Sequence, residues 1–229
     1  MGNYFKNSII KSDGSVIRSL NAKKSNLDGF LDDYANTIKA FISLYTATFN
    51  EIWLTKALLL LDYTIKNFSD EKKHLFYYTA IKEDSLITRK MEITDNVMPS
   101  SNSQMAINLY VLGLHSQNPK HIERAKKMSE YVHPFFKENG AHYANWGILI
   151  NWLINEPYQL IIVGENAIAL KNKITDYYLP NVILSGSEKE SDSPLIKNKF
   201  KKGETYVYIC KENTCLSGLT SIKEVLKIV

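Results

Sequence analysis

Residues 95–104 read DNVMPSSNSQ, and this stretch, with the helix expected after it, decides how the rest of the chain is interpreted. Pro99 ends any element before it, and Ser101 and Gln104 have the spacing of a capping box at a helix start. The apolar residues from Met105 to Leu114 cover most of the helix circumference, so this helix should be packed on several sides. Short polar side chains at the start of such a helix form either a ligand site or the polar plug of a packed corner.

Two further helical patterns precede this stretch. In residues 30–49 and again in residues 53–68, large apolar residues recur at three- and four-residue steps, and Asn50 is a cap for the second pattern. The connection between them is short, which predicts an antiparallel helix pair. Residues 74–81 and 86–91 have the pattern of two short strands and predict a hairpin.

More helices are predicted after Asn118-Pro119, ending before Pro134, and from residue 141 to residue 153. Helix pairs separated by strand-containing loops are typical of an α/α toroid, in which alternate helices line an inner ring. The sequence therefore predicts a mainly α fold, with a partial (α/α) toroid of helical hairpins in residues 1–156. Residues 157–229 alternate between strand and helix patterns and predict a small α/β C-terminal module.

The composition indicates a folded chain and excludes several classes of partner. The chain has 229 residues, of which 45% are hydrophobic, enough to bury a substantial core. The formal net charge of +4 is scattered, and the lysine cluster at residues 197–202 is interpreted as a solvated loop, so no nucleic acid is expected. No apolar run could span a bilayer and the chain start lacks a signal peptide, which predicts no membrane contact and a cytoplasmic location. The histidines lack metal-ligand spacing, so no metal is expected, and no cofactor pattern is found.

Four carboxylates are candidate catalytic groups. Asp32 and Asp33 lie in the first turn of a predicted helix, where acids also interact favourably with the helix dipole. Because adjacent helix positions point about 100° apart, these two side chains are not expected to share one site. Glu92 and Asp95 precede the serine-rich turn, and paired carboxylates near a sugar-sized pocket could transfer protons. The alternative is that Asp95 caps N–H groups of the turn.

Polar side chains near these acids are candidate ligand-binding groups. Ser100, Asn102 and Ser103 could bind a hydroxylated ligand or could only cap the helix. Tyr34, next to the paired acids, and His142, near the start of a later helix, are further candidates, although a lone histidine is more often structural or exposed. No serine lies in a G-x-S-x-G pattern, which excludes a serine hydrolase of that class.

Cys210 and Cys215 end a predicted strand and the turn after it. Their C-x₄-C spacing is not the redox C-x-x-C motif, and no second cysteine pair completes a metal site. A structural or incidental pair and a redox role both remain open.

Three stretches, in order along the chain, resemble motifs of one family. They are GFLDDYA at residues 29–35, the Asp, Pro-Ser and Asn-Ser positions within residues 95–103, and the YIC…NTC pattern at residues 208–215. Residues 13–19 and Pro180-Asn181 match collinearly. Together they resemble the thioredoxin-domain-containing proteins related to the spermatogenesis-associated thioredoxin-like protein. The resemblance implies a thioredoxin-like domain, then an α/α toroid similar to N-acylglucosamine 2-epimerases and six-hairpin glycosidases, then a small α/β region.

The resemblance also implies what the chain does. It predicts the C-terminal part of a longer protein, with a carbohydrate-type ligand at the inner helix ends and a role related to carbohydrate metabolism. A second hypothesis is a non-catalytic subunit, completed by a partner chain that supplies the thioredoxin-like domain and the first half of the toroid, or by a second copy in a homodimer. A third is redox work through Cys210 and Cys215.

Overall fold

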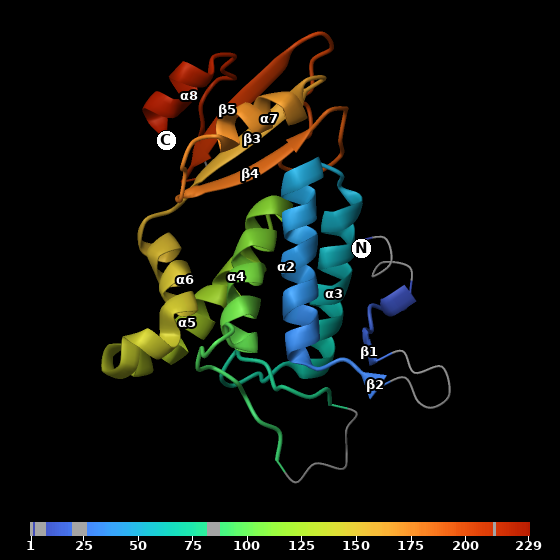
Figure 1. Cartoon of the computed structure of the whole chain (residues 1–229), viewed down its shortest axis with the longest axis vertical. Coiled ribbons are helices and arrows are strands. Elements are labelled where there is room, and N and C mark those ends of the chain that lie inside the picture. Colours follow the sequence, from blue (N-terminus) through green and yellow to red (C-terminus); the bar gives the residue numbers. More distant parts are fainter. Residues whose placement is uncertain (1, 3–7, 20–26, 82–87, 213) are drawn as a thin grey trace.

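The protein consists of a layer of helices and, above it, a small sheet with its own two helices (Figure 1). This computed structural model describes residues 2, 8–19, 27–81, 88–212 and 214–229. The helices are α2 (Leu31–Thr48), α3 (Ile52–Phe68), α4 (Ser101–Ser116), α5 (Pro119–Asn139), the 3-10 helix η2 (Gly140–Tyr143), α6 (Ala144–Ile154), α7 (Ala167–Thr175) and α8 (Ile222–Ile228). The strands are β1 (Ile17–Ser19), β2 (Leu27–Asp28), β3 (Tyr158–Gly164), β4 (Val182–Ser187), β5 (Thr205–Lys211) and β6 (Thr214–Cys215).

Helix α4 lies at the centre of the helical layer. Almost all of its residues are buried, and it packs against α2, α3, α5 and α6. The prediction that this helix is packed on several sides is therefore confirmed.

The prediction of a mainly α, partial (α/α) toroid is wrong. About 51% of the chain is helical and 15% is in strands, so the sheet is a substantial part of the fold. The helices around α4 enclose another helix, whereas the inner helices of a toroid line a ring. The physical reason is that α4 is apolar over most of its circumference and buries the most apolar surface when helices surround it.

The start of α4 differs by one residue from the prediction. Ser100, rather than Ser101, is the N-cap, and its Oγ accepts a hydrogen bond from the Ser103 N–H at 3.1 Å. Gln104 does not complete a capping box, because with Ser100 as the N-cap it lies one residue beyond the N3 position, and its Nε2 donates to Asn108 Oδ1 at 2.9 Å. The buried amide pair is a tertiary feature, since Asn108 in turn donates to the Ala35 carbonyl of α2 at 2.8 Å.

Helix α5 begins as predicted but does not end before Pro134. The Asn118 side chain accepts from the Lys120 N–H at 3.1 Å, with Pro119 as the first helical residue. The helix then continues through Pro134 to residue 139. Val132 belongs to the main core and Phe136, on the other side of the proline, packs against it, so burial of this face outweighs the local cost of proline.

The segment between α3 and α4 does not form the predicted strand hairpin. Residues 74–81 and 88–91 contain no strand, only an isolated bridge between Phe76 and Ser69. Residues 82–87, which include the start of the second predicted strand, lie outside the described part of the chain. The Asn102 side chain binds both the N–H and the C=O of Phe76, at 2.8 and 2.9 Å, and so takes the groups that a paired strand would use.

The larger sheet has the strand order β4-β3-β5-β6, and the predicted boundary at residue 157 falls directly before β3. Strands β3 and β4 are parallel and joined through α7, while β5 and β6 are antiparallel to their neighbours. Alternate residues of β3 face two separate apolar clusters. One cluster contains residues of α7 and α8, and the other contains Leu195 and Ile196 from the β4–β5 connection. Burial on both faces explains why β3 is a continuous apolar run.

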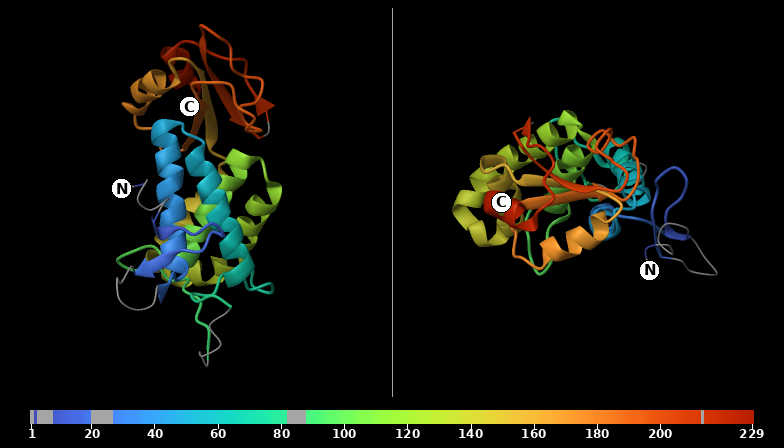
Figure 2. Two further views of the ribbon diagram at one scale, coloured as in Figure 1. Left: turned by 90° about the vertical axis from the view of Figure 1, so that its right-hand side faces the viewer. Right: turned by 90° about the horizontal axis from the view of Figure 1, so that it is seen from above.

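The sheet is seated on the upper ends of α2 and α4 (Figures 1 and 2). The Tyr45 hydroxyl donates to the Gly186 carbonyl and accepts from its N–H, both at 3.1 Å. Phe49 extends from the end of α2 into the core of the sheet. A Cβ on Gly186 would lie 2.5 Å from the Phe49 ring and 2.4 Å from the Ile162 carbonyl oxygen, so this junction requires glycine.

Candidate functional site

The predicted residues around α4 form one buried hydrogen-bonded cluster. Asp95 is 7% exposed, and its Oδ1 accepts from the Ser100 N–H at 2.8 Å and from the Ser103 hydroxyl at 2.7 Å. Its Oδ2 accepts from the Asn145 N–H at 2.8 Å, and the Asn145 side chain donates to Ser103 Oγ at 3.0 Å. Asp95 therefore joins the start of α4 to the start of α6.

Asn102 and Glu92 extend this cluster. Asn102 is fully buried, and its Nδ2 donates to the Glu92 carbonyl at 2.9 Å in addition to its bonds with Phe76. The Ser101 hydroxyl donates to Glu92 Oε2 at 3.1 Å. His142 takes part only through its backbone carbonyl, which accepts from the Asp95 N–H at 2.7 Å, while the residue itself is exposed. The structure thus brings the predicted residues together, with their polar groups occupied by one another.

Asp32 and Asp33 form a second, more exposed cluster. Arg18 Nη1 lies 3.1 Å from Asp32 Oδ1 and 2.9 Å from Asp33 Oδ2, so one cation joins both carboxylates. The expectation that these two side chains do not share one site is wrong. Asp32 Oδ1 also accepts from the Asp33 N–H at 3.0 Å, which turns this carboxylate toward the residue that follows it.

Competing effects act on the pKa of Asp33. Its Oδ2 accepts from the Phe30 N–H at 2.9 Å, which caps α2. Burial raises the pKa of Asp33, and the nearby Asp32 carboxylate adds to this, while the Phe30 N–H and the Arg18 guanidinium oppose it. The resulting pKa lies above the ordinary aspartate value of 3.8. A partly buried carboxyl with a raised pKa beside a second carboxylate is typical of functional sites.

An open groove of about 720 Å³ runs along α2 from this acidic pair. Asp32, Asp33 and Asn36 line its polar end, and Ala40, Leu44 and Ala47 line its apolar side. Tyr34 does not face the groove: it is 1% exposed, and its hydroxyl accepts from the Val16 N–H at 2.9 Å. Burial raises the pKa of Tyr34, as expected for a core tyrosine.

Cys210 and Cys215 form a disulfide between the paired strands β5 and β6. Cys210 is buried in the sheet, whereas Cys215 is exposed at its edge. The two residues are directly opposite in the antiparallel register, which explains how a C-x₄-C spacing brings them together. No group of three or more His, Cys, Asp or Glu residues in the described ranges could hold a metal ion.

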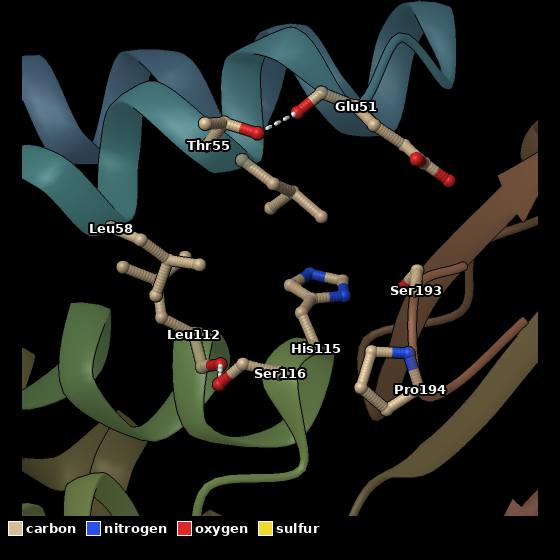
Figure 3. Close-up of a pocket in the computed structure, with 9 residues that line it drawn as sticks. Glu51, Thr55, Leu58, Leu112, His115, Ser116, Ser193 and Pro194 are labelled. Atoms are coloured by element: carbon tan, nitrogen blue, oxygen red, sulfur yellow. Dashed lines mark hydrogen bonds between the residues drawn. The ribbon is translucent and has the colours of Figure 1, made fainter. Parts of the chain in front are cut away.

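A cavity that the sequence did not indicate lies where the helices meet the sheet (Figure 3). Its volume is about 200 Å³, and His115, on the last turn of α4, is part of its wall. The His115 ring packs edge-on against Tyr45, with the ring centroids 5.2 Å apart. Burial lowers the pKa of His115 to about 4, so the ring is neutral at physiological pH. A histidine directly after the mainly apolar run of residues 105–114 was the available signal for this site.

Comparison with known proteins does not assign the chain. It matches no model of a known protein family, and a search of curated proteins finds none that is significantly similar. Among the helices that the structure describes, none is long and apolar enough to cross a membrane.

Proposed function

We propose that the chain binds a small hydroxylated molecule of the carbohydrate class in the groove beside α2. One observation carries this proposal: Asp32 and Asp33 are the predicted acids that line a cavity. Their side chains are 34% and 25% exposed, so they retain oxygen surface that ligand hydroxyls can reach. Carboxylates accept hydrogen bonds from hydroxyl groups, and the apolar side of the groove at Ala40, Leu44 and Ala47 suits the C–H face of a sugar ring.

The size of the groove supports a ligand of this class. Ligand pockets commonly enclose about 300–1,000 Å³, and the groove of about 720 Å³ falls within this range. Arg18 holds the two carboxylates in place, which reduces the ordering cost of binding. The proposal is for binding, because both oxygens of Asp95 accept hydrogen bonds within the protein and offer no free base.

Membership of the thioredoxin-domain-containing family is part of this proposal. It rests on the three motifs that occur in order along the chain. The first contains Asp32 and Asp33, and the third contains Cys210 and Cys215. On this proposal a thioredoxin-bearing partner chain supplies the remainder of the protein, in the cytoplasm. The groove is then the carbohydrate-type site of this part.

Thermal unfolding of the chain with a panel of mono- and disaccharides tests the proposal. A bound sugar at about 100 times its Kd should stabilise the native state by about 2.7 kcal/mol and raise the Tm by several degrees. Asp33→Asn should remove most of this rise while leaving the sugar-free melt close to wild type, because the amide oxygen can still cap α2. Asp28→Asn is the matched control, since this neighbouring exposed acid pairs with Lys11 and does not line the groove.

The proposal fails if no sugar raises the Tm, or if Asp33→Asn responds as strongly as the control. A response that Asp33→Asn removes and Asp28→Asn keeps would locate the ligand at the acidic end of the groove.

A second candidate function is assembly, and a different feature of the groove favours it. The exposed positions 36, 40, 43 and 47 of α2 are Asn, Ala, Ser and Ala, which form a row of small residues along one helix face. Small side chains let another helix approach closely, so this face suits a helix of a second copy of the chain. Sedimentation of the wild type and of Ala40→Arg tests this: assembly predicts a dimer that the variant converts to monomer, and a monomeric wild type contradicts it.

A further inference from the structure

We infer that the cavity beside His115 is a separate binding site for a small, uncharged, single-ring molecule that carries one hydroxyl group. This site lies between the helical layer and the sheet, away from the α2 groove, and does not depend on the function proposed there (Figure 3).

One ring nitrogen of the buried His115 side chain is unpaired. His115 is 3% exposed, and its Nδ1 lies 2.9 Å from the Ser185 hydroxyl oxygen of β4. Its Nε2 is also buried, yet it has no hydrogen-bond partner in the described part of the chain. Leaving a buried polar atom unpaired costs about 1–3 kcal/mol, so a ligand that pairs with Nε2 recovers this free energy.

The other polar residues that line the cavity have hydrogen bonds elsewhere and do not pair with His115 Nε2. Thr55 donates its hydroxyl to the Glu51 carbonyl at 3.1 Å, and Ser116 donates to the Leu112 carbonyl at 2.6 Å, both within their own helices (Figure 3). A carboxylate oxygen of Glu51 accepts from the Ser191 hydroxyl. The remaining wall contains one more polar residue, Ser193, and is otherwise apolar, from Leu54, Leu58, Leu112 and Pro194.

Size and charge restrict the occupant. An apolar cavity of about 150 Å³ can hold benzene, so the 200 Å³ here accommodates one ring with a substituent. The His115 ring is neutral, and Glu51 is the charged residue that lines the cavity, which disfavours an anion. The dominance of apolar walls disfavours a strongly hydrated cation. An uncharged, mainly apolar molecule remains.

A hydroxyl group is the substituent that fits His115 in either tautomer. If Ser185 donates to Nδ1, then Nε2 carries a proton and needs an acceptor, whereas the opposite arrangement leaves Nε2 needing a donor. A hydroxyl oxygen accepts and its hydrogen donates, so the same group meets both cases.

Phenol and toluene are the probes, because they differ only in having a hydroxyl or a methyl group on the same ring. Calorimetric titration of the full chain should show phenol binding about tenfold more tightly than toluene, corresponding to one buried hydrogen bond. Long-range ¹H–¹⁵N spectra should show a change in the His115 ring nitrogens when phenol, but not toluene, is added. In His115→Phe the phenol preference should disappear, and the exposed-histidine control His133→Phe should keep it.

Three results would overturn the inference. They are no binding of either probe, equal binding of both by the wild type, or a phenol preference that His115→Phe retains. If His115→Phe does not fold, the wild-type titration and ring spectra decide alone: a tenfold preference with a shifted His115 signal supports the site, and the absence of either rejects it.

Discussion

The polar side chains near the two ends of α4 differ in whether they have hydrogen-bond partners within the protein. At the first turn, Asp95, Ser100 and Ser103 bind one another and Asn145, and both oxygens of the Asp95 carboxylate are occupied. At the last turn, His115 has one paired nitrogen and one unpaired nitrogen beside a cavity. The hydrogen bonds of the Asp95 carboxylate are thus complete, whereas those of His115 are not, and Gln104 Oε1, next to the Asp95 cluster, is also buried without a partner in the described part of the chain.

This difference distinguishes polar groups that stabilise the fold from polar groups that can still bind a ligand. A buried group with all its partners inside the protein stabilises the fold and gains nothing from a ligand. A buried group that lacks a partner, or a half-buried pair such as Asp32 and Asp33, still has hydrogen bonds to form. Four predictions test this comparison.

The largest effect is expected from Asp95→Ala. The substitution removes the acceptor for three donors, on Ser100, Ser103 and Asn145, two of which belong to other buried residues of the same cluster. We expect the free energy of unfolding to fall by about 4 kcal/mol. Urea unfolding followed by circular dichroism measures this, with the exposed Asp176→Ala as control. A loss no larger than that of the control would show that the first turn of α4 is not a structural cluster.

The pH dependence of stability tests the other end of the helix. The ordinary pKa of a histidine side chain is 6.5, and the pKa of His115 in the folded chain is about 4, so between these values the unfolded chain binds more protons. The contribution of His115 should therefore be fully present above pH 6.5 and should be lost as pH falls toward 4. The total loss should be about 3 kcal/mol.

Denaturant unfolding of the wild type and of His115→Phe over this pH range isolates the effect of one histidine. The difference between the two proteins should change with pH as described, and His133→Phe should follow the wild type. Parallel curves for wild type and His115→Phe would mean that His115 is not a buried neutral residue.

The disulfide extends the comparison to the edge of the sheet. Cys210 and Cys215 have a sequence separation of 5, and the entropy of closing so short a loop predicts a contribution of about 2 kcal/mol. Cys215→Ser should lower the free energy of unfolding by this amount. A reductant should lower the free energy of unfolding of the wild type equally and should leave that of the variant unchanged. Equal stability with and without reductant would indicate that the pair adds nothing to the fold.

The smallest effect is expected from Arg18→Ala. Its two ion pairs with Asp32 and Asp33 are about one-third exposed and screened by solvent, so their loss should cost only about 0.5 kcal/mol. Thermal unfolding at low and high salt checks this, because the difference between wild type and variant should shrink at high salt. A loss as large as that of Asp95→Ala would place the acidic pair among the structural clusters and weaken the proposed binding groove.

Much of the fold follows from the sequence alone. The apolar circumference of residues 105–114 predicts a helix surrounded by others, and Asn118-Pro119 marks the start of α5. The strand, helix and strand patterns after residue 157 predict β3, α7 and β4. These features depend on periodicity and local capping, which neighbouring residues determine.

The tertiary structure decided the arrangement of the helices and the role of each polar residue. Periodicity does not specify which helices meet, so helices around α4 and helices around a ring have similar patterns. Asp95 is hydrogen-bonded to Asn145, which is 50 residues away in the sequence, and His115 to Ser185, which is 70 residues away. Whether a buried polar group is paired depends on such distant partners, so only the folded chain distinguishes the structural first turn of α4 from the cavity at its other end.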